Sequence, residues 1–228
     1  MGKAFVFLFT IATALVGASN NLEAARDGQD RAALERAIAE ASTAANAKPQ
    51  DATAQYRTAL AQSYLAEVAM ELRDKGQARS AAEAGIQAAE KAVSLAPAVA
   101  EHHRILGTLC GQVIPANVLA GLKYGRCALD SINRAIELDA KSSVAYLSRG
   151  IGNYYLPSSF GGGVETAIRD IRKALQLDPK SSAAYMWLGV ALRKANRNAE
   201  AREALAKSVQ LNPRRVWAKQ QLEKTPAQ

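Results

Sequence analysis

Residues 182–213 read SAAYMWLGVALRKANRNAEAREALAKSVQLNP, and this stretch decides the fold. Tyr185, Leu188 and Leu192 recur at helical spacing, so a first helix can bury one face. A polar segment follows, and then a second apolar pattern begins at Ala201. The stretch therefore predicts two amphipathic helices joined by a tight turn.

The second helix carries the same kind of signal. Leu205 follows Ala201 by four residues, which places both on one helix face. Gly189 and Ala201 are small, as required where two helices approach closely. Pro213 then ends the helix, because proline cannot continue the hydrogen-bond ladder. The unit is a helical hairpin with a defined stop.

This order of residues resembles the tetratricopeptide repeat, whose pattern W-x2-L-G-x2-Y, A-x3-F and a final proline extends over about 34 residues. Leu188-Gly189 reproduces the LG pair, and the other positions hold side chains of the expected size. The resemblance implies an all-α, right-handed superhelical solenoid of antiparallel helix pairs. It implies a scaffold rather than an enzyme.

Upstream segments repeat the second-helix signature. They are Gly85-Ala89-Ala92, Ala128-Ile132-Ala135 and Ala167-Ile171-Ala174. We expect four units between an N-terminal capping half-repeat and a C-terminal cap or tail, because terminal repeats are commonly atypical. The half-repeat takes residues 19–50, the units about 51–97, 98–140, 141–179 and 180–213, and the tail 214–228.

The first three units are longer than the standard repeat. In the first unit we expect longer helices. In the second and third, the helix signatures stay intact, so we expect the extra residues between the paired helices. Such insertions depart from the family pattern and weigh against a uniform groove.

The first eighteen residues have a different character. Lys3 precedes an apolar run from Ala4 to Ala18 that ends in small residues. This order is typical of a signal peptide cleaved near Ala18. The sequence therefore predicts an exported protein, periplasmic or secreted, and the alternative is an uncleaved membrane anchor.

Export would place Cys110 and Cys127 where disulfides persist. Two small buried apolar residues are the first interpretation. A disulfide between them is the alternative, and it requires Cα atoms within about 7 Å.

In tetratricopeptide repeats, the first helix of each pair lines the concave groove. The resemblance therefore implies a protein or peptide partner, held by an apolar strip that bears tyrosines and has basic residues at one end. The expected groove residues are Arg104, Thr108, Leu147, Ile151, Tyr154, Tyr155, Met186, Val190, Arg193 and Lys194. The alternative is that part of this strip packs against an inserted loop.

Residues 156–163, LPSSFGGG, form the most distinctive insertion. A phosphate-binding loop needs a preceding strand and a following Lys-Ser/Thr, and both are missing. A structural turn is therefore favoured, with Pro157, Gly161, Gly162 and Gly163 shaping it. Phe160 has a further possible role as a binding lip, and the loop resembles those of other exported repeat proteins, some associated with solute transporters. A small-molecule-binding accessory protein of an envelope transport system is thus the alternative function.

Catalytic groups are not recognisable. His102 and His103 are adjacent, so they point in different directions from a helix, and we expect neither a metal site nor a cofactor. We expect His103 in the core and Asp170 on a solvent-facing helix surface.

Charge is concentrated at the C-terminal end. Residues 180–228 contain ten Lys and Arg but three Asp and Glu, in a chain of formal net charge +8. This end could meet an anionic envelope surface or an acidic partner, or be a solvated cap. Nucleic acid is not expected as a partner, because no reading element is recognisable.

Overall fold

The computed structural model describes residues 21–116 and 121–227. In these ranges every regular element is helical, which confirms the all-α class. A helical segment at residues 21–27 comes first, and a short 3-10 helix, Ser158–Phe160, precedes α8. The α-helices that follow residue 30 are α2 (Arg31–Ala47), α3 (Ala52–Glu71), α4 (Lys75–Leu95), α5 (Ala100–Ala116), α6 (Gly121–Leu138), α7 (Ser143–Tyr155), α8 (Val164–Leu177), α9 (Ser182–Lys194), α10 (Asn198–Leu211) and α11 (Val216–Glu223).

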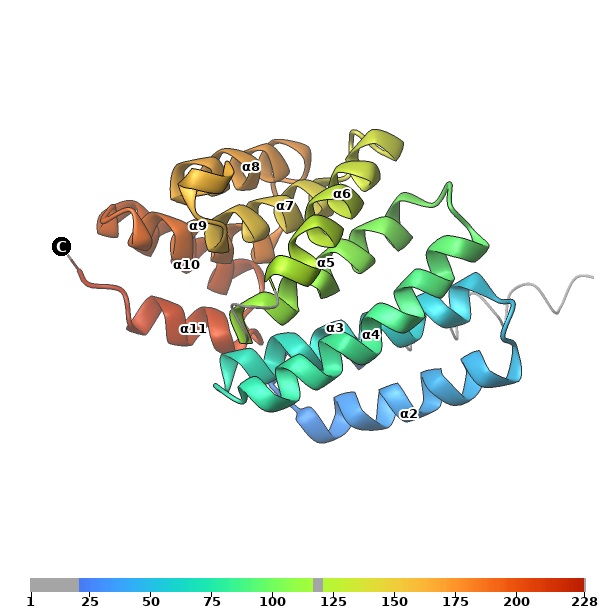
Figure 1. Ribbon diagram of the computed structural model, residues 1–228. Helices are drawn as coiled ribbons and strands as arrows, with labels where there is room; N and C mark the ends of the chain where they lie inside the picture. The colour runs from blue at the N-terminus through green and yellow to red at the C-terminus, as the bar shows by residue number, and fades with distance from the viewer. Residues whose placement is uncertain (1–20, 117–120, 228) are drawn as a thin grey trace, which may run out of the picture.

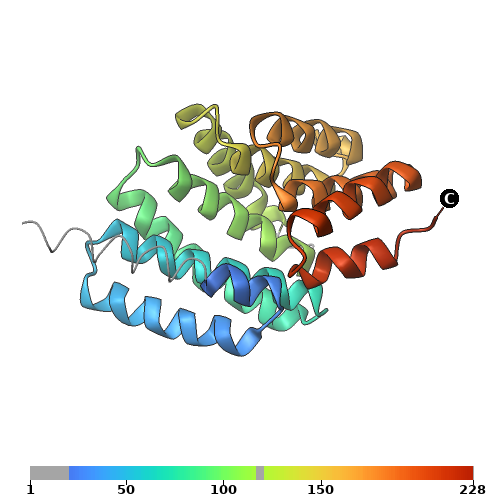
Figure 2. The ribbon, with the colours of Figure 1, turned by 180° about the vertical axis from the view of Figure 1, so that it is seen from behind.

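Consecutive helices pack as pairs, α3 with α4, α5 with α6, α7 with α8 and α9 with α10. The first helices of the pairs also contact one another, from α3 through α5 and α7 to α9 and α11. The second helices pack on their own partners and on the first helix of the next pair. The result is a curved stack with an inner layer of first helices (Figures 1 and 2).

Glycine sets the distance between paired helices, as the sequence predicts. A Cβ added at Gly189 would lie 2.5 Å from Leu205 Cγ and 2.8 Å from the carbonyl oxygen of Ala201. Gly150 approaches Ala167 and Ile171 of α8 in the same way. These partners stand four residues apart in each second helix, so one packing motif recurs along the chain.

The turn within a helix pair is also repeated. Gln29, Arg73 and Asn196 all have positive φ, of 56°, 65° and 60°. The residue after each of them donates its backbone N–H to a carbonyl five residues earlier, at 2.8–2.9 Å. The turn at Gln29 therefore joins two helices of a pair. The expected half-repeat is wrong in this respect, because residues 21–27 are helical and their Leu22 and Ala25 pack into the core.

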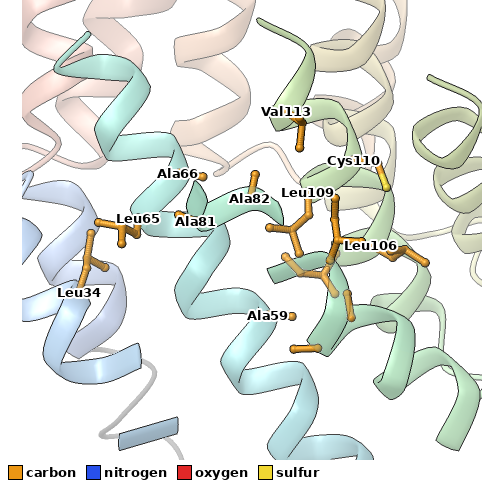
Figure 3. Packing of buried hydrophobic residues seen from close by; sticks show 14 of the residues in the cluster. Leu34, Ala59, Leu65, Ala66, Ala81, Ala82, Leu106, Leu109, Cys110 and Val113 are labelled. Carbon is orange, nitrogen blue, oxygen red and sulfur yellow. The ribbon is translucent and has the colours of Figure 1, made fainter. Parts of the chain in front are cut away.

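The buried apolar residues form two separate clusters. The first extends from Leu22 to Ala128 and is rich in alanine, as Figure 3 shows around Ala59, Ala66 and Ala82. The second extends from Tyr146 to Leu222 and contains larger side chains such as Trp187. The small side chains of the first cluster let its helices approach closely. The two clusters have no residue in common.

The extra residues of the long units are placed differently from one unit to the next. In the first, α3 and α4 have 20 and 21 residues, against 13 and 14 in α9 and α10. In the second, α5 and α6 have 17 and 18 residues. The expectation that this unit keeps its extra residues between the helices is therefore wrong, because they continue the helices. In the third, residues 156–163 do separate α7 from α8.

The predicted signal peptide, residues 1–18, lies outside the described residues. Among the helices of residues 21–116 and 121–227, none combines the length and the apolar character needed to cross a membrane.

Candidate protein-binding face

The inner layer is a single surface tied together by hydrogen bonds between first helices. Ser63 of α3 donates to Gln112 Oε1 of α5 at 3.1 Å, and Gln112 Nε2 donates to the Ser63 carbonyl at 3.1 Å. Thr108 of α5 donates to Ser148 Oγ of α7 at 3.2 Å. Lys194 of α9 donates to the carbonyl of Tyr154 at 2.8 Å. These pairs are about one repeat apart in sequence, so equivalent surfaces of successive repeats lie side by side.

Arg104 is the centre of the polar part of this face. Its guanidinium donates to both carboxylate oxygens of Glu101, at 2.7 and 2.5 Å, and Tyr56 donates to the same carboxylate at 2.8 Å. Burial opposes the charge of Arg104, but Glu101 outweighs burial and raises its pKa. Burial and Glu101 also raise the pKa of Tyr56. Arg104 lies on the predicted face, but its charge is already paired.

The aromatic part of the face consists of Tyr154 and Tyr155 of α7, Trp187 of α9 and Trp217 of α11. Neighbouring ring centroids are separated by 5.0–6.3 Å, mostly edge to face. This geometry is favoured by the ring quadrupoles. Tyr155 is 48% exposed, whereas Trp187 is 8% exposed. Burial and the neighbouring Tyr154 raise the pKa of Tyr155 to about 12, so its hydroxyl stays neutral.

Lys194 supplies an accessible positive charge beside this cluster. Its Nζ lies 4.2 Å from the centroid of the Tyr154 ring, and the residue is exposed. Ile151, also predicted for the groove, is half-buried and packs against the second core cluster. The accessible strip therefore combines an aromatic ring, an aliphatic side chain and a cation.

Three predicted groove residues belong to the core instead. Leu147, Met186 and Val190 are 8%, 1% and 4% exposed and pack in the second cluster. Their assignment to a partner-binding surface is corrected, because buried side chains offer almost no surface to another molecule. Helical periodicity shows which side chains lie on the inner half of a helix. It does not show which of them are buried in the core and which are exposed in the groove.

Arg193 has a structural role that the sequence did not reveal. Its guanidinium donates to Gln221 Oε1 at 2.6 Å, to the Gln221 carbonyl at 3.2 Å and to Thr225 Oγ1 at 3.1 Å. It thereby fastens α11 to α9. The assignment of Arg193 to the partner surface is corrected as well, since its donors are occupied within the chain.

The glycine-rich loop is a self-contained turn. Gly161 and Gly163 have φ of 84° and 103°, which favours glycine. The backbone N–H groups of Gly161, Gly162 and Gly163 donate to carbonyls of the loop and of α7, at 2.8–3.2 Å. These donors are therefore unavailable to a phosphate, in agreement with the structural turn favoured by the sequence.

Phe160 at the tip of this loop is 74% exposed. An open depression of about 590 Å³ lies elsewhere, lined by residues of α7 and α8 such as Tyr146, Arg149 and Lys173. The loop contributes nothing to its lining. A role for Phe160 as a binding lip stays a prediction.

Cys110 and Cys127 form a disulfide that joins α5 to α6, with Cα atoms 6.0 Å apart. The first interpretation, two unbonded thiols, is therefore wrong. The sequence pattern assigned Cys110 and Cys127 to the two helices of one pair. The distance between the two cysteines depends on the lengths of those helices, which the pattern did not give.

The burial of His102 and of Asp170 differs from the sequence prediction. His102 rather than His103 is buried, at 6% exposure, and its ring lies 5.5 Å from that of Tyr56. Asp170 is 7% exposed, accepting from Arg149 at 2.8 Å twice and from Asn153 at 2.9 Å. Asp170 is thus an internal acceptor between α7 and α8.

Across the described residues, no group of three His, Cys, Asp or Glu side chains is placed to hold a metal ion.

The basic C-terminal end is partly neutralised within the chain. Arg215, 4% exposed, is bound by Glu67 and Glu71 of α3, and Arg202 donates to the Thr225 carbonyl at 2.7 Å. The basic residues exposed to solvent in this region are Lys180, Lys194, Lys207, Arg214, Lys219 and Lys224. The binding of Arg215 by α3 was missed, because no local pattern marks a contact between positions so far apart in sequence.

Comparisons with known proteins agree with this architecture. Residues 161–215 match a family model described as Tetratricopeptide repeat. No curated protein matches the sequence. The fold is similar to that of a thermophilic TPR protein in Thermus thermophilus, with 18% identity, a TM-score of 0.62, and coverage of 90% of this chain and 99% of that one.

Two further solved structures show weaker similarity. YrrB, described as a TPR protein with an unusual peptide-binding site, has 21% identity and a TM-score of 0.45, with 82% of each chain covered. MamA from Desulfovibrio magneticus RS-1 has 18% identity and a TM-score of 0.46, with 86% of this chain and 95% of that chain covered. Residues 161–215 thus match the tetratricopeptide repeat, and the stacked helix pairs have a fold similar to that of the Thermus TPR protein.

Proposed function

We propose that this protein is an exported scaffold that holds a segment of another protein against its inner face. The observation that carries the proposal is Tyr155, which is 48% exposed and packs in an aromatic cluster around the buried Trp187. A tetratricopeptide-repeat fold is an interaction scaffold, and its inner face is the surface where successive repeats present equivalent side chains.

The chemistry of this face favours a protein segment. Tyrosine is enriched at the centres of protein interfaces, where one ring buries a large area at a small entropic cost. Gln112, Thr108 and Ser148 add donors and acceptors on the adjoining helices. Lys194 adds a positive charge next to the rings. A partner segment fits this arrangement if an apolar or aromatic side chain packs on Tyr155 and a neighbouring polar or acidic side chain lies near Lys194.

Export is supported by two independent features. The apolar run before Ala18 is typical of a signal peptide. The Cys110–Cys127 disulfide fits an oxidising compartment, because thiols are kept reduced in the cytosol. The exposed basic residues of the C-terminal end would then face an anionic envelope surface.

Tyr155→Asp is expected to lower capture of the native partners at least tenfold, because a carboxylate replaces the anchoring ring. The matched control is Leu129→Asp on the outer helix α6, where Leu129 is 40% exposed. The measurement is affinity capture from the cell envelope, with each captured protein quantified by mass spectrometry for wild type and both variants.

Circular dichroism should give the same helical content for the three proteins, because both side chains reach solvent. If Tyr155→Asp captures the same proteins in the same amounts as Leu129→Asp, the inner face is not the binding surface.

A further inference from the structure

Positive charges gather on the outer face of α8, the second helix of its pair. Arg169 and Lys173 stand four residues apart, Arg172 lies beside them, and all three residues are exposed. α8 lies on the outer side of the stack, away from the inner layer of first helices (Figure 1). Cations four residues apart on a helix repel each other, so this arrangement costs stability.

The outer helices α4 and α6 pair a cation with an acid at the same spacing. Their ion pairs between residues four apart are Arg79–Glu83 at 3.1 Å and Arg126–Asp130 at 3.2 Å. In the part of the chain that the structure describes, neither Arg169 nor Lys173 forms an ion pair. The repulsion between these two cations of α8 is therefore not relieved by an ion pair within the chain.

Two acidic residues border these cations and neutralise them only in part. Glu200 of α10 lies 3.6 Å from Arg172, but it also accepts two hydrogen bonds from Arg197, at 2.7 and 2.6 Å. Glu165 is exposed one turn before Arg169, and within residues 121–227 it forms no ion pair. One carboxylate without an ion pair thus stands against two such cations, so positive charge is in excess.

Arg149 of α7 adds a cation that is held in place beside α8. Its guanidinium donates to both carboxylate oxygens of Asp170 at 2.8 Å and lies 5.2 Å from the centroid of the Tyr146 ring. With a long third bond to Asn133 at 3.5 Å, three of its five N–H donors are engaged. The side chain is still 31% exposed. Two donors therefore remain on a fixed group, which lowers the entropic cost of binding an anion.

These cations line the open depression of about 590 Å³ between α7 and α8. Arg149 and Tyr146 come from α7, and the three exposed cations come from α8. The depression shares no residue with the inner-face strip of Tyr155 and Lys194. It is therefore a second surface of the scaffold, and its charge suits an anionic ligand.

We propose that this depression binds an acidic segment of a second protein. Guanidinium groups form paired hydrogen bonds with carboxylates, and lysine adds a point charge. Residues four apart on a helix have Cβ atoms about 5–6 Å apart, and alternate side chains of an extended segment are about 7 Å apart. Two acidic side chains of one extended segment therefore reach Arg169 and Lys173 together, and a third carboxylate can meet Arg149.

A single phosphate or a membrane surface fits this arrangement less well. A phosphate needs donors that converge on one point, whereas the cations of α8 are distributed along a turn of helix. Arg149, beside the buried Asp170, is reached by a side chain that enters the depression rather than by a flat surface. Because the depression is separate from the inner face, binding there does not depend on the proposed function.

The test measures the fluorescence anisotropy of a labelled, N-acetylated octapeptide in which glutamate alternates with serine. Wild type is expected to bind this peptide, and more weakly as salt is raised, because salt screens exposed charges. The double variant Arg169→Gln, Lys173→Gln is expected to bind it about tenfold more weakly, since each exposed charge pair contributes a few-fold in affinity. The same peptide with glutamine in place of glutamate should not bind.

Lys75→Gln, Arg79→Gln on α4 is the matched control, because it removes two exposed cations four residues apart from another outer helix. It should bind the acidic peptide as wild type does, and so should Tyr155→Ala on the inner face. Urea unfolding should find Arg169→Gln, Lys173→Gln at least as stable as wild type, since a repulsion within α8 is removed.

The proposal is overturned if wild type does not bind the acidic peptide, if the α8 double variant binds it as wild type does, or if the α4 control weakens binding equally. A lower stability of the α8 double variant would also overturn it, because the two cations would then serve the fold. The same holds if this variant loses binding of inorganic phosphate or of phosphatidylglycerol vesicles more than of the peptide, or if light scattering finds a wild-type dimer that it abolishes.

Discussion

Replacing Gly189 by alanine is expected to lower the free energy of unfolding by about 1–3 kcal/mol, although alanine is the better helix former. The added Cβ would lie 2.5 Å from Leu205 Cγ and 2.8 Å from the Ala201 carbonyl oxygen. The backbone oxygen cannot move without shifting α10, so the pair of helices must separate. Urea unfolding followed by circular dichroism at 222 nm measures the effect.

Gly152→Ala is the control, in the equivalent first helix α7. A Cβ at Gly152 meets no atom within 4 Å. This variant should be stabilised by about 0.5–1 kcal/mol, because alanine loses less backbone entropy in a helix. Equal effects of the two substitutions, in either direction, would mean that Gly189 does not set the distance between the paired helices.

Reduction of the Cys110–Cys127 disulfide is expected to lower the free energy of unfolding by about 3 kcal/mol. The two cysteines are 17 residues apart, and closing a loop of about that length removes this much chain entropy from the unfolded state. The measurement is urea unfolding with and without reductant, compared at the same pH.

The double variant Cys110→Ala, Cys127→Ala separates loss of the bond from other effects of the reductant. Its stability should match that of the reduced wild type and should not respond to reductant. A wild-type midpoint that is the same with and without reductant would show that the bond contributes nothing to stability.

The repeating part of the fold was predictable from local patterns. Gly189, Ala201 and Leu205 are separated by short distances along the chain, and their contact is set within one helical hairpin. The same contact recurs at Gly150 with Ala167 and Ile171, which are also four residues apart. Periodicity therefore identified the pairs, the small residues between them and the order in which the pairs stack.

The division between core and surface was less predictable. Leu147, Met186 and Val190 lie on the inner half of their helices, but they are buried in the second cluster. Asp170 belongs to a polar helix face in sequence, yet Arg149 and Asn153 cover it in the structure. Such burial depends on how neighbouring helices and repeats are rotated, which a single repeat does not encode.

Contacts between distant repeats could not be predicted from the sequence. Arg215 donates to Glu71 across 144 positions, and this contact requires the curvature of the stack to bring the start of α11 next to α3. A basic residue shortly after a proline carries no local sign of such a role.

Photo-cross-linking from position 155 tests the proposed binding face most directly. A photoreactive phenylalanine derivative placed at Tyr155, and in a second variant at Leu129, reports which surface a partner touches in the intact cell envelope. The expected result is a discrete cross-linked partner from position 155 and none from position 129. Cross-links to the same protein from position 129 alone, or equally from both positions, would contradict the assignment of the inner face.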